Sequence, residues 1–345
     1  MNISIKGVVL TAGLAIAAGL GTIQVTEAKT RLVVNCFWPP QHFVCQKALP
    51  NWIAEVERVT DGRVTGIIPP KSVAAPPEQL AAVEKGIADV SVQFNGLIQN
   101  RVTGPLVAMN PFISTDDPVA MSTALWETNQ KFFPDEFDSV HLLSQWVISA
   151  GELYSQTDTP VNSMDELKSR KIWALPGTLA AIMKNIGAGV VATPAVKSNE
   201  IISRGVVDAH IGLDPQGVRA FQLMPYTKSM TKFSENIYTT SFSLIINNDK
   251  WAEISEEDRA AITEVSGEAF ARMAAGLWRE STLSALGTFE EKGLTIVPAD
   301  PAFEKALKEA SEFATAAWIE KAKAAGIDGQ GAYDFYTARV QELSK

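Results

Sequence analysis

Residues 31–68, RLVVNCFWPPQHFVCQKALPNWIAEVERVTDGRVTGII, set the pattern of the fold. Residues 31–36 form an apolar run that is typical of a buried strand, and residues 44–59 repeat apolar side chains at helical spacing. A turn then leads into a second strand-like run at residues 64–68. This order predicts a strand, a helix and a strand, which is the repeating unit of a parallel sheet.

The same rhythm continues outward from this stretch. A helix near residues 77–85 precedes a strand at residues 88–94. A second run of strands and helices then has predicted strands at residues 144–154, 171–174 and 206–212. Two such runs predict an α/β fold with two lobes, and we expect ligands to bind at the carboxyl ends of the strands.

A long helix is predicted in the C-terminal part. Ser255 is typical of a helix start, with Asp258 three positions later, and the helical pattern continues to Lys292. At about 1.5 Å per residue, such a helix of roughly 38 residues would be about 57 Å long. Because this length exceeds one lobe, we expect the helix to pack along both. Residues 302–325 predict a further amphipathic helix.

The beginning of the chain is typical of an export signal. Lys6 precedes an apolar run at residues 8–18, and Thr26-Glu27-Ala28 places small residues where cleavage occurs. Residues 1–28 are therefore predicted to be a cleaved signal peptide, which places the mature protein in the periplasm. The formal net charge of −9 argues against nucleic acid as a partner.

The two cysteines, Cys36 and Cys45, leave two interpretations open. Export permits a disulfide between them, whereas burial as two small hydrophobic side chains is the alternative. Their spacing cannot decide between these interpretations, because a disulfide depends on geometry.

Motifs for catalysis and for cofactors are missing from the sequence. It contains no Gly-x-Ser-x-Gly elbow, no His-Glu-x-x-His helix and no phosphate-binding loop. Three scattered histidines and two cysteines give poor support for a metal site, so we predict no metal and no cofactor. A secreted enzyme that uses Glu152 and Asp214 as paired acids is the remote alternative.

Several segments, in their order and spacing, give the chain a family resemblance. These are VERVTDGRV at residues 56–64, GIADV at 86–90, SRGVVDA at 203–209 and NNDKW at 247–251. Together they resemble the periplasmic solute receptors of TRAP transporters, of the DctP type. The resemblance implies a two-lobed periplasmic-binding-protein-like fold, a long helix that spans both lobes, a small-molecule ligand, a membrane permease as partner and no enzymatic activity.

The resemblance also suggests how the chain divides. We expect lobe I to contain residues 29–149 and about 238–265. Lobe II would then contain residues 150–237 and about 266–345. We expect the protein to be a monomer.

Three departures from the family pattern bear on the ligand. The family usually has an arginine, which binds a carboxylate, at the position of Trp173, and often has a basic residue at the position of Glu152. An asparagine is common at the position of Asp214. Two acids and an indole in these places predict an organic cation, such as ethanolamine, choline or a related amine.

Aromatic residues at strand ends could complete a cage around such a cation. His42 or Asn95 would bind a ligand hydroxyl. The predicted ligand-binding residues are Trp38, His42, Phe94, Asn95, Trp146, Glu152, Trp173, Asp214 and Phe242. The remaining tryptophans are predicted to pack in the core: Trp52, Trp126, Trp251, Trp278 and Trp318. The rival hypothesis is a betaine or a carboxylate that binds through Arg101 or Arg219.

Overall fold

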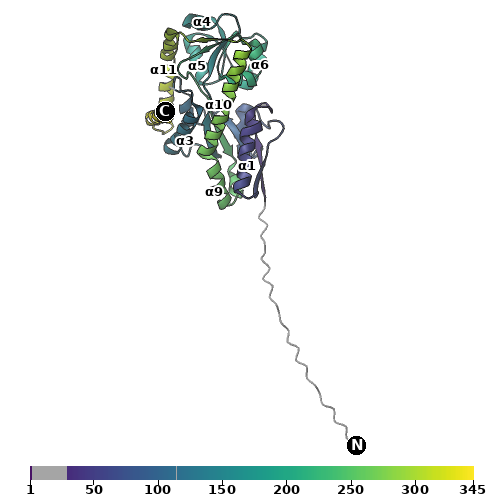
Figure 1. Cartoon of the computed structure of the whole chain (residues 1–345). Helices are drawn as coiled ribbons and strands as arrows, with labels where there is room; N and C mark the ends of the chain where they lie inside the picture. Colours follow the sequence, from purple (N-terminus) through teal and green to yellow (C-terminus); the bar gives the residue numbers. More distant parts are fainter. Residues whose placement is uncertain (2–28, 114) are drawn as a thin grey trace.

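The computed structural model describes Met1, residues 29–113 and residues 115–345 (Figure 1). Apart from Met1, the predicted signal peptide lies outside the described residues. None of the helices in these ranges combines the length and the apolar character that a membrane span requires.

The first sheet has five strands in the order β2-β1-β3-β10-β4. β1 pairs in parallel with β2 and β3, as the sequence predicts. β10 comes from much later in the chain and lies antiparallel between β3 and β4. The strands are β1 (Thr30–Asn35), β2 (Val64–Ile67), β3 (Val90–Phe94), β4 (His141–Val147) and β10 (Ser241–Ile246).

The second sheet has six strands in the order β11-β9-β5-β8-β6-β7. β6 is parallel to β7 and β8, and β9 is parallel to β11, whereas β5 is antiparallel to both of its neighbours. The strands are β5 (Glu152–Ser155), β6 (Lys171–Ala174), β7 (Gly189–Ala192), β8 (Ala209–Leu213), β9 (Ser229–Lys232) and β11 (Thr295–Pro298).

The single strand predicted at residues 144–154 is wrong. The structure divides this stretch into β4 and β5, which belong to different sheets, so residues 148–151 cross from one lobe to the other. Gly151 permits this crossing, because a Cβ atom there would lie only 2.6 Å from the backbone of Gly212.

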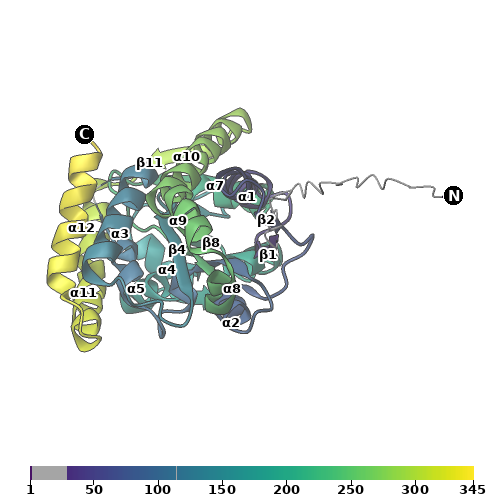
Figure 2. The ribbon, with the colours of Figure 1, turned by 90° about the horizontal axis from the view of Figure 1, so that it is seen from below.

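Helices cover the faces of both sheets (Figures 1 and 2). Those of the first half are η1 (Val44–Ala48), α1 (Leu49–Val59), η2 (Pro76–Glu78), α2 (Gln79–Glu84), η3 (Asn95–Leu97), η4 (Gly104–Met109), α3 (Pro118–Phe132) and α4 (Met164–Ser169). The rest are α5 (Thr178–Ile186), η5 (Ala195–Lys197), α6 (Ser198–Ser203), α7 (Pro215–Ala220), η6 (Met224–Tyr226), α8 (Asn248–Glu253), α9 (Glu256–Val265), α10 (Gly267–Glu291), α11 (Pro301–Ala324) and α12 (Gly329–Leu343).

The predicted helix from Ser255 to Lys292 is interrupted. Ser266 leaves the helical region, with φ −100° and ψ −140°, so α9 and α10 are separate helices. Trp52 Nε1 donates to Ser266 Oγ at 3.0 Å, and Ser144 Oγ donates to the carbonyl oxygen of Gly267 at 2.6 Å. Side chains from the first lobe therefore satisfy the polar groups at the break.

The expected spanning role belongs to α10 alone. It packs against α3 and β4 on the first sheet and against α7 at the second (Figure 1). The C-terminal helices also connect both parts: α11 packs against α5, whereas α12 packs against α3 (Figure 2). The predicted division of the chain into lobes stays a prediction.

The structure joins Cys36 and Cys45 in a disulfide, with their Cα atoms 5.8 Å apart. The bond joins Cys36, which follows β1, to Cys45 in η1. It therefore fixes the two ends of the intervening loop close to each other. This loop contributes several side chains to the cavity described below.

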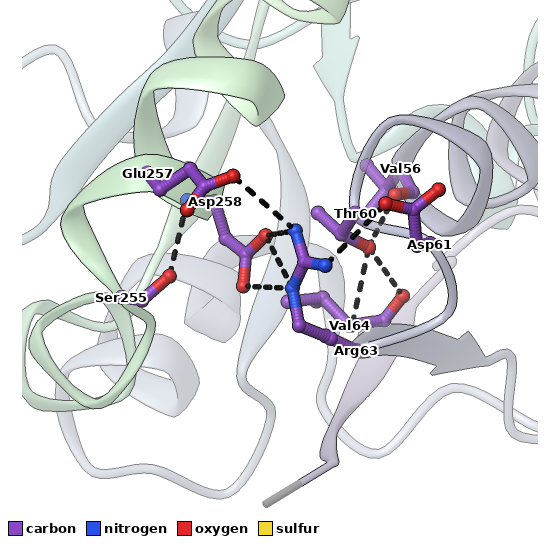
Figure 3. Close-up of polar contacts among 8 residues, drawn as sticks. All are labelled: Val56, Thr60, Asp61, Arg63, Val64, Ser255, Glu257 and Asp258. Atoms are coloured by element: carbon purple, nitrogen blue, oxygen red, sulfur yellow. Dashed lines mark hydrogen bonds and ion pairs between the residues drawn. The ribbon is translucent and has the colours of Figure 1, made fainter. Parts of the chain in front are cut away.

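A buried carboxylate attaches α9 to the first sheet (Figure 3). Arg63, which directly precedes β2, donates from Nη2 to Asp258 Oδ1 at 2.7 Å and from Nε to the same carboxylate. The side chain of Asp258 is only 5% exposed. The hydrogen bond from Arg63 holds the pKa of Asp258 below its usual range. The carboxylate is therefore ionised and paired, which makes this contact stronger than a surface ion pair.

Asp258→Asn should lower the free energy of unfolding by about 2 kcal/mol, because Arg63 loses its charged partner. The folded pKa of Asp258 is depressed, so its contribution is present above the unfolded pKa and is lost as pH falls through the folded pKa. The difference between wild type and variant, measured by urea unfolding, should therefore shrink below about pH 4.

Glu55→Gln is the matched control for this prediction. It removes a carboxylate from the pair with Arg58, in which both side chains are more than half exposed. Such a pair contributes little to stability. Equal losses of stability in the two variants would contradict the role assigned to Asp258.

Candidate functional site

A cavity lies between the two sheets. Its walls follow the carboxyl ends of β1, β3, β6 and β8, where the sequence predicted a ligand site. The walls come from both lobes, with further contributions from α7 and α10. A concave, mostly apolar lining with a few polar groups is typical of a small-molecule site.

Aromatic rings form most of one wall. Trp38 and Phe242 lie 5.1 Å apart between ring centroids, and Phe94 and Phe242 lie 5.4 Å apart. Trp278 on α10 approaches both Trp38 and Phe242 at 6.0 Å. The aromatic lining consists of Phe37, Trp38, Phe94, Phe221, Phe242 and Trp278. Such a surface binds an aromatic ring or an organic cation.

The polar lining is small. It consists of His42, Asp214, Gln216 and Thr240. No lysine or arginine is found among the described residues that line the cavity. No group of three or more potential metal ligands occurs in the described part of the chain.

Asp214 is buried and holds three elements together. As the N-cap of α7, its Oδ1 accepts from the Gly217 N–H at 2.9 Å. Its Oδ2 accepts from Trp278 Nε1 at 2.7 Å and from Thr282 Oγ1 at 2.8 Å. Burial raises the pKa of Asp214, and these hydrogen bonds oppose the rise. Asp214 therefore orients Trp278, and its oxygens already have protein partners.

His42 and Gln216 join the lobes beside the cavity. His42 Nε2 lies 3.0 Å from Gln216 Nε2, and His42 Nδ1 accepts from the Val44 N–H at 3.2 Å. Burial lowers the pKa of His42 to about 3, so the ring is neutral. Both residues also line an outer groove, so they form the wall between the groove and the cavity.

Five of the nine predicted site residues line the cavity: Trp38, His42, Phe94, Asp214 and Phe242. The other four are absent from its lining, for different reasons. Asn95 accepts from Ser243 Oγ and donates to Ser241 Oγ beneath the cavity. Trp146 is fully buried and packs behind Phe242, with the ring centroids 5.6 Å apart.

Trp173 and Glu152 differ most from their expected placement. Trp173 is fully buried in the second lobe, and its Nε1 donates to Thr193 Oγ1 at 2.8 Å. Glu152 accepts from the Phe233 N–H at 3.2 Å. Burial raises the pKa of Glu152 to about 8, and the Phe233 N–H opposes the rise. The carboxyl group is therefore mostly neutral at pH 7, which removes the expected negative charge.

The two arginines of the rival hypothesis also lie elsewhere. Arg101 donates to Glu84 at 2.6 Å. Arg219 donates to the side chains of Ser284 and Ser281 and faces the outer groove. Neither of them lines the cavity.

Trp278 packs in the core, as predicted, but it also lines the cavity, which was not foreseen from the sequence. Its helical position gives no sequence signal for this role, which depends on the contact with Asp214. Phe37 directly follows the strand predicted at residues 31–36, so the strand-end argument that selected Trp38 could also have selected Phe37. Gln216 and Thr240 carry no such signal, since polar residues in short connections are common.

Two lobes that enclose one cavity at their strand ends define a two-lobed solute-binding protein. The chain belongs to the family described as bacterial extracellular solute-binding protein, family 7 (DctP), which matches residues 34–321. It is a periplasmic solute receptor of the TRAP type and not an enzyme. Such receptors bind a small molecule and work with membrane permease components.

Individual relatives agree with this assignment. Over 313 residues the chain is 36% identical to "Outer membrane transporter protein TsaT" of Comamonas testosteroni, covering 90% of this chain and 91% of the relative. A TRAP periplasmic solute binding protein from Bordetella bronchiseptica, solved with bound (R)- and (S)-mandelate, is 30% identical. The match covers 91% of this chain and 99% of that protein, with a TM-score of 0.86. A marine metagenome TRAP solute binding protein, 22% identical, shares the fold with a TM-score of 0.85 over 92% of this chain and 100% of that protein.

Glu152→Gln should change how stability depends on pH. The folded pKa of Glu152, about 8, exceeds its ordinary value of 4.5. Its stabilising effect is therefore complete below pH 4.5 and is lost as pH rises towards 8. In the wild type, the free energy of unfolding should lose about 1 kcal/mol per pH unit across this range. Glutamine still accepts from Phe233 but does not titrate, so the variant should lose less in urea unfolding.

Glu320→Gln at an exposed site is the control and should leave the wild-type pH dependence unchanged. Parallel curves for wild type and Glu152→Gln would contradict the raised pKa. The variant also tests the cation hypothesis. If Glu152 bound a cationic ligand, Glu152→Gln would weaken the binding of that ligand to the protein.

Proposed function

We propose that this receptor captures a small aromatic acid, with the ring in the aromatic part of the cavity and the acid group at its polar end. The observation that carries this proposal is the cluster of six aromatic side chains that line the cavity from both lobes. Ring pairs in offset or edge contact contribute about 0.5–1.5 kcal/mol each, beyond the burial of apolar surface. Several such contacts favour a ligand with a ring over a purely aliphatic one.

The relative from Bordetella bronchiseptica supports the same class of ligand. It was solved with bound mandelate, which is a phenyl ring with a short acid group, and it is 30% identical over almost its whole length. The aromatic lining of the cavity would pack against the phenyl ring of such a ligand.

An organic cation is the second candidate. The Asp214 carboxylate at the cavity, the aromatic faces and the lack of a lysine or arginine in the described lining favour it. Against it, the oxygens of Asp214 already accept three hydrogen bonds, and Glu152 and Trp173 lie outside the lining. A betaine would use the aromatic wall in the same way and is part of this second candidate.

The proposed mechanism is capture by lobe closure. The ligand stabilises the closed form because it contacts both lobes at once. A micromolar dissociation constant, about −8 kcal/mol, is a suitable scale for release to a permease. Export through a cleaved signal peptide and a monomeric receptor remain part of the proposal.

Isothermal titration against a panel of ligands tests the proposal. The panel contains (R)-mandelate, benzoate, 2-phenylethylamine, choline, ethanolamine, glycine betaine and succinate. We expect micromolar binding of an aromatic acid and at least tenfold weaker binding of the amines and of succinate. Selective binding of choline, ethanolamine or betaine would favour the second candidate.

Trp38→Leu should weaken the binding of the aromatic acid by about tenfold, since it removes one ring contact worth about 1 kcal/mol and some buried area. Trp251→Leu is the control, because Trp251 stacks on His141 at 4.4 Å and does not line the cavity. If both variants bind as tightly as the wild type, the aromatic wall is not the ligand site.

A further inference from the structure

We propose that the Gln216 side-chain amide and the Thr240 hydroxyl bind the acid group of the ligand, in place of the missing basic residue. The inference rests on the proposed function. It adds the identity of the residues that make the site prefer a ligand with a single negative charge. Gln216 belongs to α7 of the second lobe, and Thr240 directly precedes β10 of the first. The two side chains therefore reach the cavity from opposite lobes.

Both residues have a buried polar atom without a protein partner. Gln216 is 4% exposed and Thr240 is 3% exposed, and both line the cavity. As placed, Gln216 Oε1 and the Thr240 hydroxyl lack a hydrogen-bond partner in the described part of the protein. Buried polar groups are normally paired, so these atoms indicate a polar ligand.

His42 determines which end of the Gln216 amide is available. The Val44 N–H lies at the start of η1, and His42 Nδ1 accepts from it. In a neutral imidazole whose Nδ1 is the acceptor, Nε2 carries the hydrogen and donates. The atom placed 3.0 Å from His42 Nε2 is Gln216 Nε2, but two donors cannot pair. Because the oxygen and nitrogen of a glutamine amide are assigned from their hydrogen-bond partners, we infer that the amide is turned by 180°, with its oxygen towards His42. The NH₂ group of Gln216 is consequently the end without a partner.

This orientation decides the sign of the preferred ligand. An NH₂ group and a hydroxyl donate to an oxyanion, whereas an amide oxygen in the same place would accept from an ammonium group. Hydrogen bonds from neutral donors to a charged acceptor are among the stronger ones. Neutral donors also add no positive charge to the cavity. They can therefore stabilise a ligand with one negative charge better than a ligand with two.

Asp214 strengthens the preference for a monoanion. Its carboxylate lines the same cavity without a neighbouring lysine or arginine in the described lining. A second carboxylate on the ligand would have to be buried near this charge without a counterion, which is costly. The site therefore favours aromatic monoacids over dicarboxylates.

The test compares Gln216→Leu, Gln216→Glu and Thr240→Val by titration with (R)-mandelate and 2-phenylethylamine. Gln216→Leu and Thr240→Val each remove a donor to the acid group and should weaken mandelate binding by about 10- to 100-fold. Glutamate still accepts from His42 but presents an oxygen to the cavity. Gln216→Glu should therefore abolish mandelate binding and improve amine binding.

Gln41→Leu is the control, because Gln41 is exposed next to His42 and lies outside the cavity lining. It should bind mandelate as the wild type does. Circular dichroism melting of each ligand-free variant separates loss of the fold from loss of binding.

The outcomes separate the two proposals. A wild type that binds an aromatic acid, with unchanged affinity in Gln216→Leu and Thr240→Val, overturns the inference and leaves the proposed function standing. Retained mandelate binding in Gln216→Glu would likewise reject the orientation of the amide. A wild type that binds no acid of the panel rejects the proposed function and this inference together.

Discussion

The buried carboxylate of Asp214 connects the parts of the structure that form the binding cavity. It follows β8, caps α7 and accepts hydrogen bonds from Trp278 and Thr282 on α10. A buried carboxylate is tolerated only when donors surround it. The position of the spanning helix against the second lobe, and of the Trp278 ring against the cavity, therefore depends on this one group.

The hydrogen bonds to Asp214 also explain why this acidic side chain in the cavity wall need not bind a cationic ligand. The Asp214 charge is used inside the protein, where two side-chain donors and a backbone N–H already meet it. The remaining cavity is aromatic and close to neutral in its polar lining. In the proposed function, selectivity depends on the direction of individual hydrogen bonds, one of which His42 sets through the tautomer that the Val44 N–H selects.

The fold was largely predictable because its strands and helices have clear local patterns. The strand at residues 31–36, the helix at 44–59 and the caps at Ser163 and Ser255 all have counterparts in the structure. The wrong predictions of element boundaries arose where two adjacent elements have the same apolar or helical sequence pattern. An apolar run concealed the crossing between β4 and β5, and helical periodicity concealed the break at Ser266, which is held by side chains distant in sequence.

The sequence by itself determined the family, the two-lobed α/β architecture and the edge of the sheets where the cavity lies, since these depend on periodicity and on the order of segments. Only the tertiary structure decided which side chains reach the cavity. Trp173 and Glu152 lie at strand positions that sequence comparison associates with the ligand, yet both point into packed surroundings. Trp278 and Gln216 reach the cavity because contacts with Asp214 and His42, far away in the chain, place them there.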